Sequence, residues 1–121
     1  MKSKNPGFGA AKPIPRRGEI WWVALDPVLG SEIAKTRPCV VLSRDTVNEL
    51  RRTVVVVPLS SSPVPHPPIH VAVRCAGKPA VAVVDQVRAI SKQRLRRRVG
   101  ILSGEEIDSI VDALQQILDL R

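Results

Sequence analysis

Short runs of apolar residues alternate with polar or turn-forming residues along most of the chain, and this pattern predicts β-strands. Several runs are apolar at both odd and even positions, which indicates strands that are covered on both faces. The predicted strands occupy residues 18–25, 37–43, 53–59, 69–74, 80–90 and 96–102. The segment 80–90 is expected to be one long strand or a strand with a bulge. Short helical turns are expected at 44–51 and 91–95.

The end of the chain shows a helical period instead. Ser103 and Glu106 have the spacing of a capping box, in which each side chain accepts a hydrogen bond from the other residue's backbone N–H. Apolar residues then recur at helical spacing, at Ile107, Ile110, Val111, Leu114, Ile117 and Leu118. The predicted fold class is therefore mainly β with a C-terminal helix, arranged as a small, mostly antiparallel barrel whose closure would protect the strand edges.

The length of 121 residues is typical of one domain with its own core. Residues 1–15 are rich in Gly, Pro, Lys and Ala and are expected to form a flexible tail, followed by a single domain over 16–121. Lys and Arg outnumber Asp and Glu by 19 to 11, which gives a formal net charge of +8. Such an excess favours nucleic acid or an anionic surface as partner, and a basic protein without such a partner stays open as the alternative.

Several classes of function are disfavoured by what the sequence lacks. Aromatic residues make up only 2% of the chain, which argues against a platform that stacks bases on rings. Cys39 and Cys75 lie in apolar segments without a CxxC pair, so both are expected to be small buried residues, and no metal or other cofactor is expected. Neither a signal peptide nor an apolar run near the ~20 residues of a membrane span is visible. A cytoplasmic protein without a membrane partner is expected.

Polar residues end or interrupt apolar strands at three places. Arg37 lies at the start of a strand, before Pro38, and offers a planar fork of donors suited to phosphate. Ser60 follows a valine run and presents a hydroxyl at a strand end. Asp85 and Gln86 interrupt a run of alanine and valine, and a buried carboxylate needs a partner. Each has an ordinary alternative: a surface arginine, a serine-rich turn, or a buried network that fixes the sheet.

Two further features carry weaker signals. His66 and His70 are acid–base candidates because imidazole titrates near neutrality, but the sequence identifies no partner for either one. The basic cluster at 94–98 is suited to a phosphate backbone, and a solvated charged face is the alternative.

Taken in order, these motifs resemble one known family. "RGEIWWVALDP", "GSE" and "RPCVVLS" are followed by "VVPLSSS", by "VVDQVRAI" and by the amphipathic helix. This series is similar to the MazF/PemK family of toxin endoribonucleases, from about Arg17 to Leu120. The resemblance implies an SH3-like antiparallel β-barrel of the CcdB/PemK-like kind, with a C-terminal helix.

The resemblance also implies an activity, partners and site residues. Family members similar to this chain are homodimers that cleave single-stranded RNA at short sequences without a metal. Each is neutralised by a cognate MazE-like antitoxin whose extended acidic tail covers the RNA groove. The implied catalytic residues are Arg37, Ser60, Glu32 and Asp85. The implied substrate-binding residues are Lys35, Thr36, Ser61, Gln86 and Arg88.

Two positions depart from the family pattern. Ser60 stands where threonine is usual, which keeps the hydroxyl, and Thr36 stands where some relatives have histidine, which removes an imidazole acid or base. Cleavage is expected to begin with attack of the RNA 2′-hydroxyl on the adjacent phosphorus, leaving a 2′,3′-cyclic phosphate and a 5′-hydroxyl, in messenger, ribosomal or transfer RNA. Two alternatives stay open on the same fold: a non-enzymatic gyrase poison similar to CcdB, and an inactive nucleic-acid-binding relative.

Overall fold

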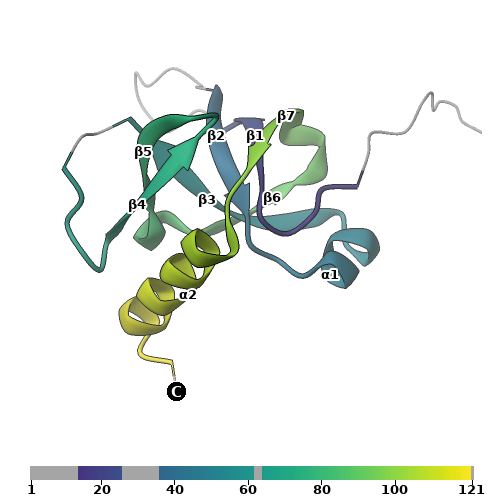
Figure 1. Ribbon diagram of the computed structural model, residues 1–121. Coiled ribbons are helices and arrows are strands. Elements are labelled where there is room, and N and C mark those ends of the chain that lie inside the picture. Colours follow the sequence, from purple (N-terminus) through teal and green to yellow (C-terminus); the bar gives the residue numbers. More distant parts are fainter. Residues whose placement is uncertain (1–13, 26–35, 62–63, 121) are drawn as a thin grey trace, which may run out of the picture.

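The computed structural model describes residues 14–25, 36–61 and 64–120 (Figure 1). Residues 1–13 of the expected tail lie outside this part. The strands within it are β1 (Glu19–Ala24), β2 (Thr36–Val41), β3 (Thr53–Ser60), β4 (His70–Cys75), β5 (Lys78–Val83), β6 (Arg88–Ser91) and β7 (Leu95–Ile101). The helices within it are α1 (Asp45–Leu50), α2 (Gly104–Leu118) and the short 3₁₀ helices η1 (Val84–Gln86) and η2 (Lys92–Arg94).

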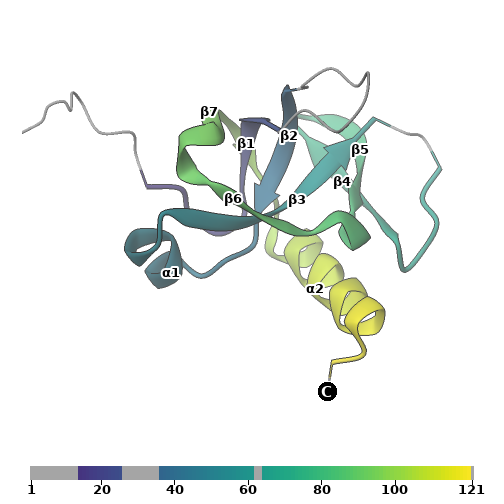
Figure 2. The ribbon, with the colours of Figure 1, turned by 180° about the vertical axis from the view of Figure 1, so that it is seen from behind.

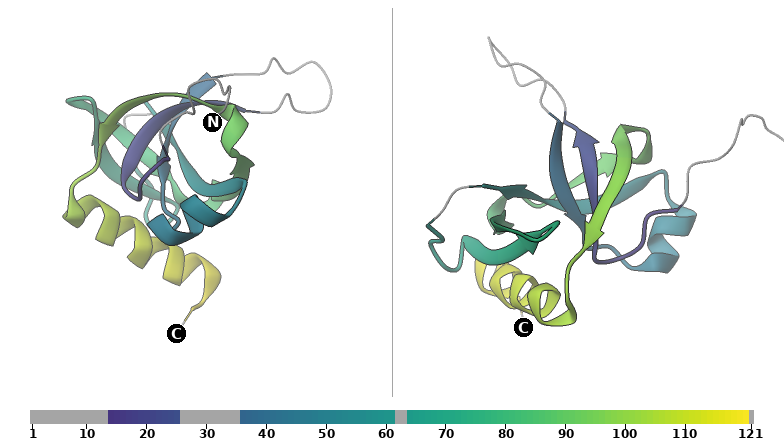
Figure 3. Two further views of the ribbon diagram at one scale, coloured as in Figure 1. Left: turned by 90° about the vertical axis from the view of Figure 1, so that its right-hand side faces the viewer. Right: turned by 45° about the horizontal axis from the view of Figure 1, so that its top comes forward.

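All of these strands belong to one antiparallel sheet in the order β4-β5-β3-β2-β1-β7, with β6 added to β3. β3 is the centre of this arrangement because it pairs with β2 on one edge and with two strands on the other. Its first half pairs with β6, and its last two residues pair with β5. A strand that changes partner in this way turns a corner in the sheet, and the sheet curves into the half-barrel seen in Figure 3. The prediction of a mainly β fold with one C-terminal helix is confirmed.

Two buried clusters lie on the two faces of the curved sheet. Successive residues of a strand point to opposite faces, so Trp21 of β1 joins one cluster and Ile20 joins the other. The cluster inside the half-barrel consists of Trp21, Val23, Cys39, Val41, Val54, Val56, Ile90 and Leu95. The second cluster lies between the sheet and α2 (Figures 1 and 2). Both sets are apolar, which explains why the strands show little alternation in sequence.

Helix α2 begins as its sequence predicts. The Ser103 hydroxyl accepts the Glu106 N–H at 3.1 Å, and the Glu106 carboxylate accepts the Ser103 N–H at 2.8 Å. Ile107 and Ile110 are buried against the sheet. Leu118, predicted on the apolar face, is 52% exposed, because the last turn of α2 extends beyond the sheet (Figure 1). None of the described helices is both long and apolar enough to cross a membrane.

The segment 80–90 is not the continuous strand that its apolar residues predict. β5 ends at Val83, η1 follows, and β6 begins at Arg88. The Val87 N–H donates to the Val84 carbonyl at 3.2 Å and closes this turn. The break takes the chain from pairing with β4 and the end of β3 to pairing with the start of β3. A run of apolar residues cannot show that the partner strand changes within it.

Candidate active site at the ends of two strands

Arg37 and Ser60 lie at neighbouring ends of the central strands β2 and β3. The antiparallel register pairs Cys39 with Pro58, and extending it by two residues places Arg37 across from Ser60. Residues that face each other in an antiparallel pair share a face of the sheet, so both side chains lie on the face of Cys39. Both are half-buried. The structure therefore brings together an arginine and a hydroxyl that are far apart in sequence.

Arg88 adds a second guanidinium to the same face. Its partner in register is Val56 of β3, which belongs to the same buried cluster as Cys39. Burial raises the pKa of the Cys39 thiol to about 12, and the charges of Arg88 and Arg37 act in the opposite direction. Both guanidinium groups therefore lie close enough to the Cys39 sulfur for their fields to act on it. The site combines two cations with a hydroxyl.

Arg94 is a third cation at this end of the sheet. Its guanidinium donates to the Ala24 carbonyl at 3.2 Å. Ala24 ends β1 and pairs with Thr36, the neighbour of Arg37. In the sequence, Arg94 belongs only to the basic cluster at 94–98, and no motif there gives it a position in a site. The cluster itself was the available signal, but its place beside the start of β2 depends on the pairing of β7 with β1.

Asp85 and Gln86 occupy η1 and are both exposed. The expectation that Asp85 is a buried carboxylate within a strand is wrong, because the chain leaves the sheet here and the buried residue of η1 is Val84. η1 packs against α2. In Figures 1 and 2 it lies beside α2, whereas β2 starts at the opposite end of the sheet. The structure groups these two residues with α2 rather than with Arg37.

The other predicted site residues divide into two groups. Glu32 and Lys35 lie outside the described residues. Thr36 and Ser61 are exposed, and each is next in sequence to a residue of the Arg37–Ser60 pair. The structure thus leaves the roles predicted for these four residues as predictions.

The two histidines are partners of each other. The His66 N–H donates to Nδ1 of His70 at 3.1 Å, and the two ring centres are 5.7 Å apart. The His70 N–H in turn donates to the His66 carbonyl at 3.0 Å. These bonds close the turn that leads into β4, so the histidines have a structural role that the sequence did not indicate.

The arrangement of Arg37, Ser60, Arg88 and Arg94 is suited to an anion. Arginine donors and a hydroxyl can hold the non-bridging oxygens of a phosphate, and they stabilise charge that develops there during a reaction. The surrounding strands hold the backbones of these residues in place. Within the described ranges, no three His, Cys, Asp or Glu side chains gather where they could hold a metal ion.

The fold and the candidate site together define a small basic β-barrel protein with arginines and a hydroxyl at neighbouring strand ends. The sequence model of the PemK-like, MazF-like toxins of type II toxin–antitoxin systems matches residues 16–118, and the chain belongs to this family. It is 37% identical over 114 residues to the endoribonuclease MazF9 of Mycobacterium tuberculosis, with 87% of this chain and 97% of that protein covered. It is 31% identical over 112 residues to the endoribonuclease EndoA of Bacillus subtilis, with 88% and 97% covered.

Solved structures show the same fold. MazF from Deinococcus radiodurans superposes with a TM-score of 0.77 at 21% identity, covering 89% of this chain and 99% of that chain. A MazE–MazF structure from Deinococcus radiodurans superposes with a TM-score of 0.78 at 19% identity, covering 91% and 100%. At these identities the likeness establishes the architecture, and it agrees with the SH3-like barrel expected from sequence.

Proposed function

We propose that this protein is the toxin of a type II toxin–antitoxin pair and a sequence-specific endoribonuclease that cleaves single-stranded RNA. The observation that carries the proposal is the placement of Arg37 across from Ser60, with Arg88 on the same face of the sheet. The names of the two curated relatives, both endoribonucleases, support it. By cutting RNA the protein would block translation and stop growth.

The reaction that suits these residues begins with attack of a 2′-hydroxyl on the adjacent phosphorus. The P–O5′ bond breaks, and the products are a 2′,3′-cyclic phosphate and a 5′-hydroxyl. Arg37 donates hydrogen bonds to the phosphoryl oxygens, where negative charge grows in the transition state. Ser60 donates a hydrogen bond to a non-bridging oxygen. Arg88, Lys35, Thr36, Ser61 and Gln86 remain proposed contacts to the RNA.

A group that removes the proton from the 2′-hydroxyl is also needed. The guanidinium of arginine keeps its proton in proteins, which makes Arg37 a poor base. Glu32 and Asp85 are the carboxylates predicted from sequence, and η1 holds Asp85 beside α2. We therefore expect Glu32→Gln to remove cleavage and Asp85→Asn to retain it, as measured by initial rates on one RNA. The reverse result would exchange their roles.

The proposal includes the setting in which the enzyme acts. The active form would be a homodimer in the cytoplasm, bound and inhibited by a MazE-like antitoxin. The titles of similar structures describe complexes of MazE with MazF and of an endoribonuclease with its cognate antitoxin. An acidic antitoxin tail would complement the net charge of +8.

One experiment tests the activity and distinguishes it from the alternatives. The chain is induced in cells, and RNA ends that carry a 5′-hydroxyl are mapped across the transcriptome. New ends at one recurrent short sequence are expected, whereas a gyrase poison would damage DNA and an inactive relative would produce neither effect. Cleavage of a purified RNA with that sequence should persist in EDTA. Loss of cleavage in EDTA would contradict the metal-independent mechanism.

A further inference from the structure

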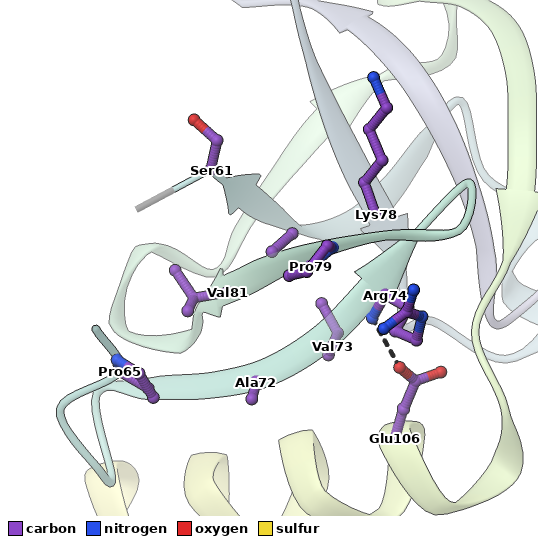
Figure 4. Close-up of a pocket in the computed structure, with 10 residues that line it drawn as sticks. Ser61, Pro65, Ala72, Val73, Arg74, Lys78, Pro79, Val81 and Glu106 are labelled. Atoms are coloured by element: carbon purple, nitrogen blue, oxygen red, sulfur yellow. Dashed lines mark hydrogen bonds between the residues drawn. The ribbon is translucent and has the colours of Figure 1, made fainter. Parts of the chain in front are cut away.

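A groove begins where β3 ends, one strand away from the proposed site. It has a volume of about 630 Å³, and its walls include Ser61, Lys78, Pro79 and Val81 (Figure 4). We call it the β3–β5 groove. Val81 pairs with Ser60, so Arg37, Ser60 and Val81 follow one another across β2, β3 and β5. Neighbouring strands are about 4.8 Å apart, which places the groove roughly two strand spacings from Arg37.

The charge in this groove is suited to an anion. No carboxylate of the described residues forms an ion pair with Lys78. Glu106, also in the wall, accepts the N–H groups of Ser103 and Arg74 at 2.8 and 2.7 Å. In Figure 4 Ser61 and Lys78 reach to the same side of the β4–β5 hairpin, away from α2, whereas Glu106 lies on the α2 side. The ammonium of Lys78 is therefore available at the end of the groove that lies away from Glu106.

The backbone of β5 disfavours a peptide as the occupant of this groove. Before Val81, at residues 78–80, β5 has no partner strand among the described residues on its β3 side. The Arg74 N–H points away from β5, toward Glu106. Pro79 pairs with Arg74. Because the Arg74 N–H does not bond to β5, this is a non-hydrogen-bonded pair, in which the backbone N and C=O groups of both residues point away from the partner strand. The backbone groups of Pro79 therefore face the open edge of β5. Proline has no N–H to offer to an added strand.

We propose that the β3–β5 groove binds the RNA segment next to the scissile phosphate, and that Lys78 contacts a backbone phosphate of this segment. The inference rests on the proposed function, since it takes Arg37 and Ser60 to hold the scissile phosphate. Lysine binds phosphate as a point charge, and the apolar surface of Pro79 and Val81 offers a base or sugar a face to pack on. The carbonyl of Pro79 at the open edge can accept a hydrogen bond from a base amino group.

The test measures binding separately from cleavage. A short single-stranded RNA with 2′-O-methyl groups, which cannot be cut by 2′-hydroxyl attack, is titrated by fluorescence anisotropy at several salt concentrations. Removal of one phosphate contact from a single strand should reduce the slope of log affinity against log salt by about 0.7. We expect this change, together with weaker binding, in Lys78→Gln. Lys78→Arg keeps the charge and should keep the slope.

The matched control is Arg51→Gln, which removes one positive charge from an exposed residue beside the start of β3. The proposal is overturned if Lys78→Gln and Arg51→Gln have the same slope and affinity. Cleavage of unmodified RNA is measured in parallel, and Lys78→Gln should raise KM and leave kcat near the wild-type value. If the wild type cuts no RNA while Lys78→Gln still reduces the salt slope, the proposed function fails and only the binding of RNA by the groove stands.

Discussion

Arg37 is the residue whose removal should affect the reaction most. Its backbone is fixed in β2, and its charge acts on the face that it shares with Ser60. We expect Arg37→Ala to lower kcat by about 10² to 10³, the loss seen when one donor to a developing oxyanion is removed. Arg37→Lys should restore little, because an ammonium lacks the planar fork.

Initial rates on the mapped RNA would measure this loss, and circular dichroism would show whether the variant remains folded. Arg51→Ala serves as the control for a change in charge alone. Full activity in folded Arg37→Ala would remove Arg37 from the mechanism.

Glu19 is a buried carboxylate with a structural role. Burial alone would raise its pKa, but hydrogen bonds from the Arg16 N–H, the Trp21 indole and Arg98 bring the pKa below its ordinary value of 4.5. These bonds measure 2.8, 3.0 and 3.1 Å. A carboxylate with a lowered pKa in the folded state contributes stability above its unfolded pKa, and this stability is lost as the pH falls through the folded value.

We therefore expect Glu19→Gln to lower the free energy of unfolding at neutral pH by about 1–3 kcal/mol. The difference from wild type should shrink once the pH falls below 4.5 and through the folded pKa of Glu19. Urea unfolding at a series of pH values measures it, with the exposed Glu49→Gln as control. A difference that stays constant into acid would mean that the charge of Glu19 is not what stabilises the fold.

At the residue scale, the sequence predicts the position of a side chain well where that residue lies at the end of a clear apolar strand. Arg37 and Ser60 end or begin apolar runs, and continued register is enough to bring them together. The prediction for Asp85 was wrong because its apolar neighbours suggest a buried strand, whereas Asp85 is exposed in η1. Arg94 was missed because its contact with Ala24 is 70 residues away in sequence.

Among the elements, α2 depends most clearly on a local signal. The reciprocal bonds of Ser103 and Glu106 start the helix, and Glu106 also accepts the Arg74 N–H of β4 at 2.7 Å. We expect Ser103→Ala to destabilise the protein by about 1 kcal/mol through loss of the cap. Urea unfolding measures this, and Ser109→Ala, an exposed position within α2, should change little. Equal effects of the two substitutions would contradict a capping role.

The difference between α2 and the segment 80–90 shows what local pattern can predict. The capping box and the helical period concern residues within a few positions of one another, so the start of α2 and its buried face could be read directly. The end of β5 depends on β3, which accepts β5 at one end and β6 at the other. Within 80–90 only Asp85 and Gln86 mark the turn, and two polar residues in an apolar run are equally compatible with a site.

For the whole molecule, the net charge of +8 predicts that the rate of association with RNA depends on salt. A strongly positive protein raises the rate of encounter with a polyanion, and salt screens this attraction. We expect the association rate constant with RNA to fall about ten-fold or more between low and physiological salt. Stopped-flow fluorescence measures it. A peptide nucleic acid of the same sequence, which carries no phosphates, should show no such dependence, and equal behaviour of the two ligands would exclude steering.

The topology of the whole molecule lies beyond what the pattern of residues could provide. Most of the elements could be anticipated, because each strand and helix has its own period, but the division of 80–90 into β5, η1 and β6 could not. The order β4-β5-β3-β2-β1-β7 depends on pairings between distant segments. Arg37 and Arg88 share a face only because β2 and β6 both pair with β3 beside one buried cluster. Arg94 reaches the end of β1 only because β7, which follows it, pairs with β1.

Cys39, on which the charges of Arg37 and Arg88 act, bears on how the protein withstands oxidation. Its thiol donates to the Arg37 carbonyl at 3.8 Å, and burial holds its pKa at about 12. Neighbouring arginines commonly activate a cysteine, because oxidants and alkylating agents attack the thiolate. Here desolvation outweighs the two positive charges, so the sulfur stays protonated and unreactive at neutral pH. Oxidative conditions that disable thiol-dependent enzymes would therefore leave this site chemically unchanged.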